Sequence, residues 1–435
     1  MRVAMPINWN LNSYSLPNLA RHNFRELGKI MNDTKSFVIS AIRTESVAVG
    51  DFNQHFDLLH IPNLGGYRFP LIESIHCKNI ILGLSGIDEV IYGKDVIAYG
   101  SPWKITKTLI DESVNNWKQF IDKIRLIHVT TKSEYEEMQK YLKIPDRKLN
   151  IIPHGVDHDF FKPSADKNKT RKEILKILNL PDKKYFLHVG ERNWKRKNLS
   201  RIFEAYKLIQ KHGIDYQLII VGKQYEQITK HGKKIPGVIF LGKISNEHLL
   251  KLYQSAEGFL LPSIHEGFGM PLVEAMSCGV PCISSDRHSP PEVLNESGIL
   301  VDPYNVESIA NAMLSLATNP SLHDELSSKS LKHAKSFSWS KNANELFNLY
   351  NIDSSKKMEN FERNYELAAY RTLVTICDLF PDEKQNFISS ILSFEYSDLI
   401  KWAIDYGLND PQTKDFLLPF EDWFYQQSEI RRTTK

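Results

Sequence analysis

Several features that would assign a sequence to a special class are scarce or absent in this chain. Of its 435 residues only four are cysteines, and they form neither a CxxC pair nor the Cys/His spacing of a metal site. No stretch reaches the roughly 18 uninterrupted apolar residues that span a membrane, and the first residues lack the pattern of a signal peptide. Lys and Arg number 55 against 52 Asp and Glu, so the net charge is only +3. The sequence therefore predicts a reduced, metal-free, cytoplasmic chain without the basic excess of a dedicated nucleic-acid binder. Contact with a membrane surface through one helix face stays an alternative.

The amino-acid composition is that of an ordinary globular protein. Apolar residues make up 42% and charged residues 25%, and at roughly 150 residues per domain the length predicts two or three domains. Short β-rich runs alternate with amphipathic stretches from the first residue, as in MRVAMPI, LARHNFRELGKIMND and SFVISAI. One such helix, KSEYEEMQKYLKI, has Ser133 as its expected N-cap. This alternation is typical of βαβ units on a parallel sheet.

A Lys-rich segment over residues 162–184 separates two such alternating series. We therefore expect an α/β fold of two doubly wound, Rossmann-like domains facing each other, with a ligand cleft where the carboxyl ends of both sheets meet. The expected domains are residues 1–162 and 163–340, followed by helices over 341–435. Residues 356–435 contain 14 aromatic side chains, above the 11% of the whole chain, which predicts a packed helical appendage and not a disordered tail.

The most informative segment is PSIHEGFGMPLVEAMSCGVPCISSD, residues 262–286. Gly267 and Gly269 follow a predicted strand, and Pro271 stands where a helix would begin. Such a helix start offers unsatisfied backbone N–H groups and about half a positive charge, which favour an anion or an electron-rich oxygen. Glu266 and Glu274 flank this start. Carboxylates there would repel a phosphate unless they accept hydrogen bonds from sugar hydroxyls.

A second cluster, ERNWKRKN over residues 191–198, follows the predicted strand YFLHVG. Several cations between a strand end and a helix are placed to neutralise a diphosphate. By itself this pattern is also that of an ordinary solvated basic turn.

Taken together, these segments resemble glycosyltransferase family 4, the retaining nucleotide-sugar enzymes of glycosyl transferases group 1 with GT-B architecture. EGFGMPLVE matches the family's pair of glutamates separated by seven residues. The similarity continues in ordered motifs between about residues 124 and 350. These motifs are IIPHGVDHDFFKP, VGERNWKRKNLSRIFEAY, IFLGKISNEHLLKLYQSAEGFLLPS, SPPEVLNESGILVDPYN and FSWSKNANELFNLY.

The resemblance implies roles for individual residues. Arg192 and Lys197 would grip the donor diphosphate, with Arg196 as a competing candidate, and Glu266 would hold hydroxyls of the donor sugar. Glu266, Arg192 and Lys197 are thus the expected catalytic residues. The remaining expected donor contacts are the backbone N–H groups of Gly267, Phe268 and Gly269, the ribose ligand Glu274, and residues 242–245, including Ser245, beside the base.

The implied chemistry needs neither a metal nor a cofactor. Similar enzymes attack the sugar from the face that the diphosphate leaves, and the leaving phosphate takes the acceptor proton. Departures from the family lie on the acceptor side, where NWNLNSYSLPN lacks the usual glycine pair and Ser85 and Gly86 stand about where a histidine is common. Asp88, His60 and His76 are the candidates that could replace that histidine.

The sequence therefore predicts a retaining glycosyltransferase that moves a sugar from a nucleoside-diphosphate donor to a hydroxyl of a glycan, a lipid-linked sugar or a small polyol. The main alternative is a donor-binding but inactive partner subunit. A glycoside hydrolase that uses Glu266 and Glu274 as its carboxylate pair, and a nucleotide-sugar epimerase, rank lower.

Overall fold

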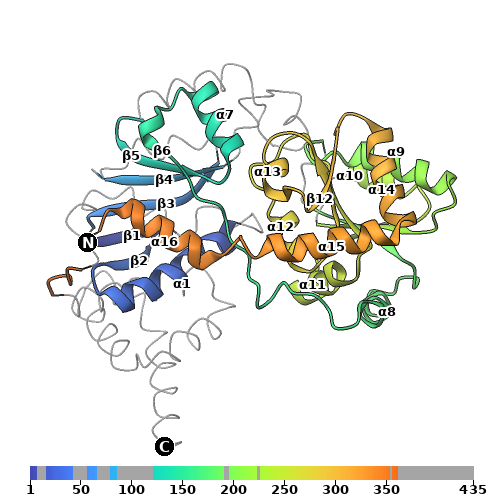
Figure 1. The fold of residues 1–435 in the computed structure, drawn as a ribbon, viewed down its shortest axis with the longest axis horizontal. Helices are drawn as coiled ribbons and strands as arrows, with labels where there is room; N and C mark the ends of the chain where they lie inside the picture. Colours follow the sequence, from blue (N-terminus) through green and yellow to red (C-terminus); the bar gives the residue numbers. More distant parts are fainter. Residues whose placement is uncertain are drawn as a thin grey trace, which may run out of the picture.

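The chain folds into two α/β units that lie side by side in a computed structural model (Figure 1). The structure describes residues 1–6, 16–42, 56–65, 79–85, 121–190, 195–222, 226–352 and 355–360. Each unit is built on a six-stranded sheet in which every neighbouring pair of strands is parallel. The two-unit α/β arrangement expected from the sequence is therefore confirmed.

The N-terminal unit has the strand order β2-β1-β3-β4-β5-β6. Its elements are β1 (Arg2–Pro6), α1 (Leu16–Thr34), β2 (Val38–Ile42), β3 (Leu58–Gly65), β4 (Ile80–Ser85), β5 (Ile124–Val129), α7 (Lys132–Leu142), the short 3₁₀ helix η2 (Asp146–Lys148) and β6 (Leu149–Ile151).

The C-terminal unit has the strand order β12-β11-β10-β7-β8-β9. Its elements are α8 (Lys167–Ile177), β7 (Tyr185–Val189), α9 (Leu199–Lys211), β8 (Gln217–Val221), α10 (Glu226–Gly232), β9 (Val238–Gly242), α11 (Asn246–Ser255), β10 (Gly258–Leu261), α12 (Met270–Ser277), β11 (Cys282–Ser285), α13 (Pro290–Leu294), β12 (Gly298–Val301), α14 (Val306–Thr318) and α15 (Pro320–Ala334).

The strand order of the C-terminal unit fixes where a ligand can bind. The chain starts in the middle of the sheet at β7, runs outward through β8 and β9, and then returns to β10 on the other side of β7. The direction of winding therefore reverses between β7 and β10. At such a switch point the loops that follow the two strands diverge and leave a crevice at their carboxyl ends.

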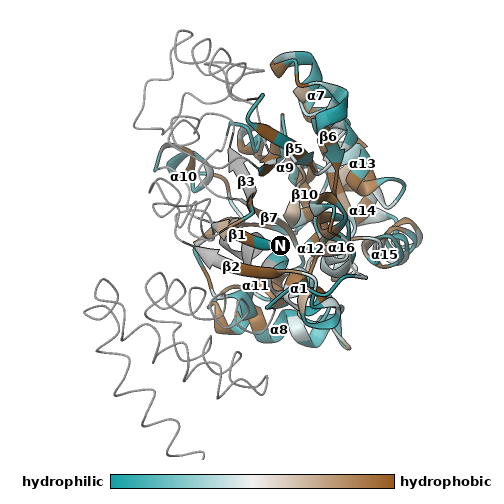
Figure 2. Ribbon diagram, turned by 90° about the vertical axis from the view of Figure 1, so that its left-hand side faces the viewer, coloured by the Kyte–Doolittle hydropathy of each residue, from teal (hydrophilic) through white to brown (hydrophobic). Residues whose placement is uncertain are grey.

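Consecutive residues of the central strands are buried, which explains why helices cover both faces of this sheet. In β7, Leu187 packs into one apolar core and Phe186 into the other. Successive side chains of a strand point to opposite faces, so both faces need a cover of helices. In the N-terminal unit, Figure 2 likewise shows the hydrophobic colour on β5 and the hydrophilic colour on turns of α7.

The last described helix, α16 (Trp339–Tyr350), crosses back to the N-terminal unit and lies beside α1 (Figure 1). Trp339 stacks on His22 with ring centroids 4.9 Å apart, and Phe347 packs on Phe37. Arg125 donates a hydrogen bond of 2.6 Å to the Leu349 carbonyl. This helix thus belongs physically to the N-terminal sheet, and residues 361–435, the rest of the predicted helical appendage, lie outside the described residues.

The two segments that connect the units pack side by side. Val156 forms a parallel bridge with Ser338, and a Cβ on Gly155 would stand only 2.2 Å from the Trp339 backbone nitrogen. A side chain at position 155 would therefore separate the two connections. No helix within the described ranges is long and apolar enough to cross a membrane.

Candidate active site

Both segments singled out in the sequence lie at the switch point, because one follows β7 and the other follows β10. The two strands are hydrogen-bonded neighbours, with Phe259 opposite Leu187. Their following loops are tied together as well, since the Ile264 N–H donates to the Arg196 carbonyl at 2.8 Å and the Asn198 amide donates to the Pro262 carbonyl at 3.0 Å.

These hydrogen bonds between the loops place two cationic side chains next to one buried carboxylate. Lys197 Nζ lies 2.5 Å from Glu266 Oε1, and Arg196 Nη1 lies 3.3 Å from Glu266 Oε2. The side chains of Lys197 and Glu266 are only 10% and 6% exposed. Burial alone would raise the pKa of Glu266, but Lys197 and Arg196 outweigh it and lower the pKa to about 2. At neutral pH the carboxylate is therefore ionised and holds both cations in place.

The start of α12 presents backbone donors next to this cluster. Gly269 occupies the N-cap position in the left-handed region, with φ 87°, and Pro271 lies in the first turn. Within the described part of the chain no acceptor takes up the N–H groups of Gly267, Phe268 and Gly269. The helix start thus offers the anion-favouring donors that the glycine spacing predicts.

Neighbours of the loop hold its backbone in this orientation. The Phe268 ring is buried and packs edge-on against His154 and Phe337. The Gly267 carbonyl accepts hydrogen bonds from Ser289 and from Thr130, the latter at 3.4 Å. With its carbonyl engaged and its ring buried, the loop can offer a ligand its N–H groups.

Glu274 lies within α12 and is partly buried. The Tyr253 hydroxyl donates to Glu274 Oε2 at 2.8 Å. Burial raises the pKa of Glu274 to about 7, and the hydrogen bond from Tyr253 lowers it only in part. The two glutamates of the motif therefore differ: Glu266 is ionised and ion-paired, whereas Glu274 is near its midpoint at neutral pH.

Other predicted residues fall in different surroundings. Ser245 is the N-cap of α11, and its side chain accepts a hydrogen bond of 3.2 Å from the His248 N–H.

On the acceptor side, His60 is fully buried, with its ring nitrogens 2.8 Å from the Tyr350 hydroxyl and 3.0 Å from His128, so it belongs to the interior of the N-terminal unit. Arg192, the Ser85 side chain, Gly86, Asp88 and His76 lie outside the described residues.

Contacts across the boundary between the units were not apparent in the sequence. The Thr131 hydroxyl lies 2.7 Å from that of Ser289, and the Lys132 N–H donates to Glu292 at 2.7 Å. Thr131, and not Ser133, is the N-cap of α7, because its side chain accepts the Glu134 N–H. The first turn of α7 therefore lies against the loops around α12 and α13.

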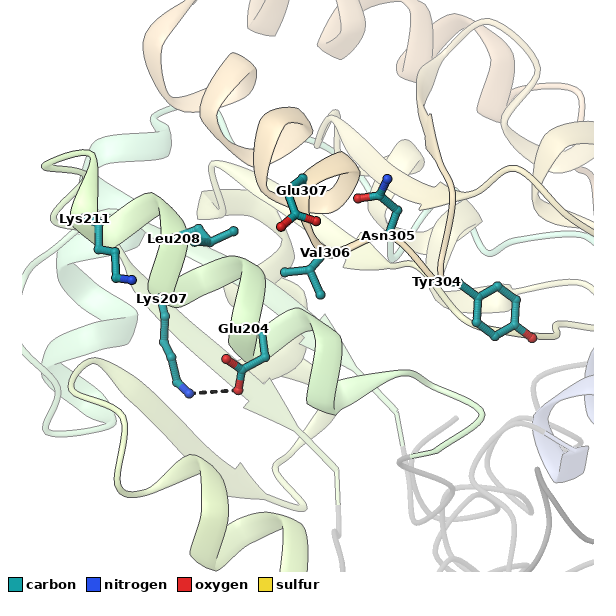
Figure 3. Close-up of a pocket in the computed structure, with 8 residues that line it drawn as sticks. All are labelled: Glu204, Lys207, Leu208, Lys211, Tyr304, Asn305, Val306 and Glu307. Carbon is teal, nitrogen blue, oxygen red and sulfur yellow. Dashed lines mark hydrogen bonds and ion pairs between the residues drawn. The ribbon is translucent and has the colours of Figure 1, made fainter.

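An open groove of ≈ 540 Å³ lies elsewhere, between α9 and the start of α14 (Figure 3). Its lining includes the ion pair of Lys207 and Glu204, together with Tyr304 and Asn305. None of the predicted site residues lines this groove. The candidate site is thus defined by the loops after β7 and β10.

Comparison with known proteins relates part of the chain to a family. Residues 170–333 match the family model described as glycosyl transferases group 1. O-antigen chain mannosyltransferase B of Escherichia coli is 33% identical over 186 residues, which are 41% of this chain and 49% of that protein. The chain thus spans about half the length of this curated relative.

Solved structures share the fold over most of the chain. Sucrose-phosphate synthase from Thermosynechococcus elongatus superposes with a TM-score of 0.63 at 18% identity, covering 80% of this chain and 98% of that one. Anabaena Alr3699/HepE in complex with UDP-glucose gives a TM-score of 0.61 at 14% identity, covering 81% and 99%. The fold is therefore GT-B, and residues 170–333 of this chain are similar to the group 1 glycosyltransferases.

Proposed function

We propose that this chain is a retaining glycosyltransferase that transfers a sugar from a nucleoside-diphosphate donor to a hydroxyl of a glycan, a lipid-linked sugar or a small polyol, without a metal. One observation carries the proposal: Lys197 and Arg196 converge on Glu266 beside the open N–H groups of α12, at the switch point of a group 1 domain. The relative from Escherichia coli is named a mannosyltransferase, and the Anabaena structure contains UDP-glucose.

The ion cluster suggests how the donor enters. Without donor, the Glu266 carboxylate is the anion that neutralises Lys197 and Arg196. A diphosphate brings a larger negative charge to the same cations, which frees Glu266 oxygens to accept hydrogen bonds from sugar hydroxyls. Bonds of this kind to an ionised acceptor contribute roughly 1.5–3 kcal/mol each.

The same groups then favour the chemical step. As the bond to the anomeric carbon breaks, negative charge grows on the leaving phosphate oxygen, toward which Lys197, Arg196 and the helix start are directed in our proposal. Fixed cations and N–H groups stabilise that charge more in the transition state than in the ground state. With donor bound, the Glu266 carboxylate would accept hydrogen bonds from the sugar hydroxyls, so we do not assign Glu266 as a nucleophile. This supports front-face attack, in which the phosphate takes the acceptor proton.

Glu274 is proposed to bind the ribose. A carboxyl group with a pKa of about 7 both accepts and donates hydrogen bonds near neutral pH, which suits a pair of vicinal hydroxyls. The Tyr253 hydroxyl fixes one of its oxygens and leaves the other for the ligand.

The test is release of nucleoside diphosphate from a panel of nucleotide sugars with several acceptors. Lys197→Ala and Glu266→Ala should each abolish turnover, whereas Lys207→Ala, an exposed lysine outside the site, should leave it unchanged. Full activity in both site variants would refute the proposal. Donor binding without turnover across the acceptor panel would instead favour an inactive partner subunit, and cleavage of a free glycoside without a nucleotide would favour a hydrolase.

A further inference from the structure

Two histidines and a glutamate from different units meet at the boundary between them. Glu137 comes from α7 of the N-terminal unit, His265 directly precedes Glu266, and His288 lies between β11 and α13. His288 Nδ1 is 2.7 Å from Glu137 Oε1, and His265 Nε2 is 3.2 Å from Glu137 Oε2. One ligand atom from each of the three side chains falls within 4.8 Å of the others.

This cluster is enclosed and held by its surroundings. The side chain of His265 is 0% exposed, that of Glu137 10%, and that of His288 17%. The two imidazole rings lie 4.4 Å apart. The backbone of His288 has φ 60°, a left-handed conformation that non-glycine residues seldom adopt. The three side chains therefore converge inside the protein, and their positions are not those of mobile surface groups.

We propose that Glu137, His265 and His288 bind a divalent first-row transition metal ion, with Zn²⁺ as the best fit, and that the ion clamps the two units together. Two imidazoles and one carboxylate are ligands that Zn²⁺ accepts, at about 2.0–2.2 Å from each donor atom. Tetrahedral ligands at such distances stand about 3.3–3.6 Å apart. To reach this geometry the two nitrogen–oxygen separations would lengthen by less than about 1 Å, and the longest separation, at most 4.8 Å, would shorten by up to about 1.5 Å. A water would complete the coordination.

The clamp follows from the origin of the ligands. His265 and His288 belong to the C-terminal unit, so an ion held by them alone would leave the N-terminal unit free. Glu137 adds a bond across the boundary, beside the contacts of Thr131 with Ser289 and of Lys132 with Glu292. The ion would fix the relation of the two units next to Glu266 and take no part in the transfer chemistry. This inference is independent of the proposed function.

The experiment uses the full chain, freed of metal with a chelator, and measures binding of Zn²⁺ by calorimetry and of Co²⁺ by its visible absorption. Wild type should bind one Zn²⁺ per chain, and Co²⁺ should give the strong bands of a low-symmetry, nitrogen- and oxygen-ligated site. Mg²⁺, which prefers oxygen ligands, should not compete. Glu137→Gln and His288→Gln should each lower the Zn²⁺ affinity at least about 100-fold, because loss of an outer partner alone costs 10- to 100-fold. His231→Gln, at an exposed histidine on α10, should not change it.

Each outcome decides the proposal. Equal Zn²⁺ affinity of wild type and both ligand variants, or a wild-type Co²⁺ spectrum equal to that of free Co²⁺, would overturn the site and leave a hydrogen-bonded contact. Unchanged affinity in Glu137→Gln with loss in His288→Gln would overturn the clamp. The wild-type spectrum decides the site even if a variant fails to fold. Since no donor is present, failure here leaves the proposed function standing, and failure of sugar transfer leaves the metal site standing.

Discussion

Replacing Glu266 by Gln should reveal how much the buried ion cluster contributes to stability. The pKa of Glu266 falls from the usual 4.5 to about 2, which corresponds to about 3 kcal/mol in favour of the folded state at neutral pH. The variant also leaves Lys197 buried with its main counter-charge removed, and breaking a buried pair costs about 3–5 kcal/mol. We therefore expect a loss of about 3 kcal/mol, or roughly 6–12 °C in the melting temperature of the C-terminal unit.

The lowered pKa of Glu266 also predicts how the stability of the fold changes with pH. Because the folded pKa is lowered, the contribution is complete above pH 4.5 and is lost as the pH falls toward 2. The difference between wild type and Glu266→Gln in thermal unfolding should therefore be largest near pH 7 and should shrink below pH 4.5.

Adding a nucleoside diphosphate and a control variant makes the thermal-unfolding experiment more specific. A nucleoside diphosphate supplies the missing negative charge, so it should stabilise Glu266→Gln more than wild type. Glu204→Gln removes an exposed partner of Lys207 and should change stability by less than about 1 kcal/mol. An unchanged melting temperature of Glu266→Gln at pH 7, or equal stabilisation of both proteins by the nucleotide, would contradict a stabilising role of the Glu266 ion cluster.

Three further predictions concern other parts of the molecule. Gly155→Ala should destabilise the chain by about 1–3 kcal/mol in urea unfolding, because its Cβ would stand 2.2 Å from the Trp339 nitrogen, whereas Gly28→Ala, with nothing within 4 Å, should be neutral or stabilising. Burial lowers the pKa of His128 to about 4, so stability should fall as the pH drops from 6.5 toward 4, and His128→Gln should flatten that slope. In urea unfolding at pH 8, Glu274→Gln should raise the free energy of unfolding by about 1–3 kcal/mol, because burial disfavours the ionised carboxylate. The same variant should bind a nucleoside diphosphate more weakly in a calorimetric titration.

The sequence predicted the parts of the site that depend on local chain geometry. Strand-like runs followed by glycines or cations place Lys197 and Glu266 at carboxyl ends of a parallel sheet, and the structure pairs the two side chains. The glycine spacing before Pro271 likewise predicted the start of α12. Local sequence patterns are sufficient here because each feature lies within a few residues of a strand end.

Features that depend on distant contacts could not be predicted in this way. Glu137 meets His265 across 128 residues, and no spacing rule relates residues so far apart. The N-cap of α7 is Thr131 because the helix starts one residue before Ser133, a boundary that the hydrophobic pattern does not define. Ser245, expected beside the base, has its hydroxyl engaged by the turn it caps.

The proposed donor site is tested most directly by a crystal structure with a bound nucleotide sugar or its intact analogue. We predict the diphosphate at the carboxyl ends of β7 and β10, with Lys197 Nζ and a guanidinium nitrogen of Arg196 about 2.7–2.9 Å from its oxygens and the Glu266 carboxylate hydrogen-bonded to the sugar hydroxyls. A donor bound in the groove between α9 and α14, or a Lys197–Glu266 ion pair left intact beside a donor bound elsewhere, would contradict it.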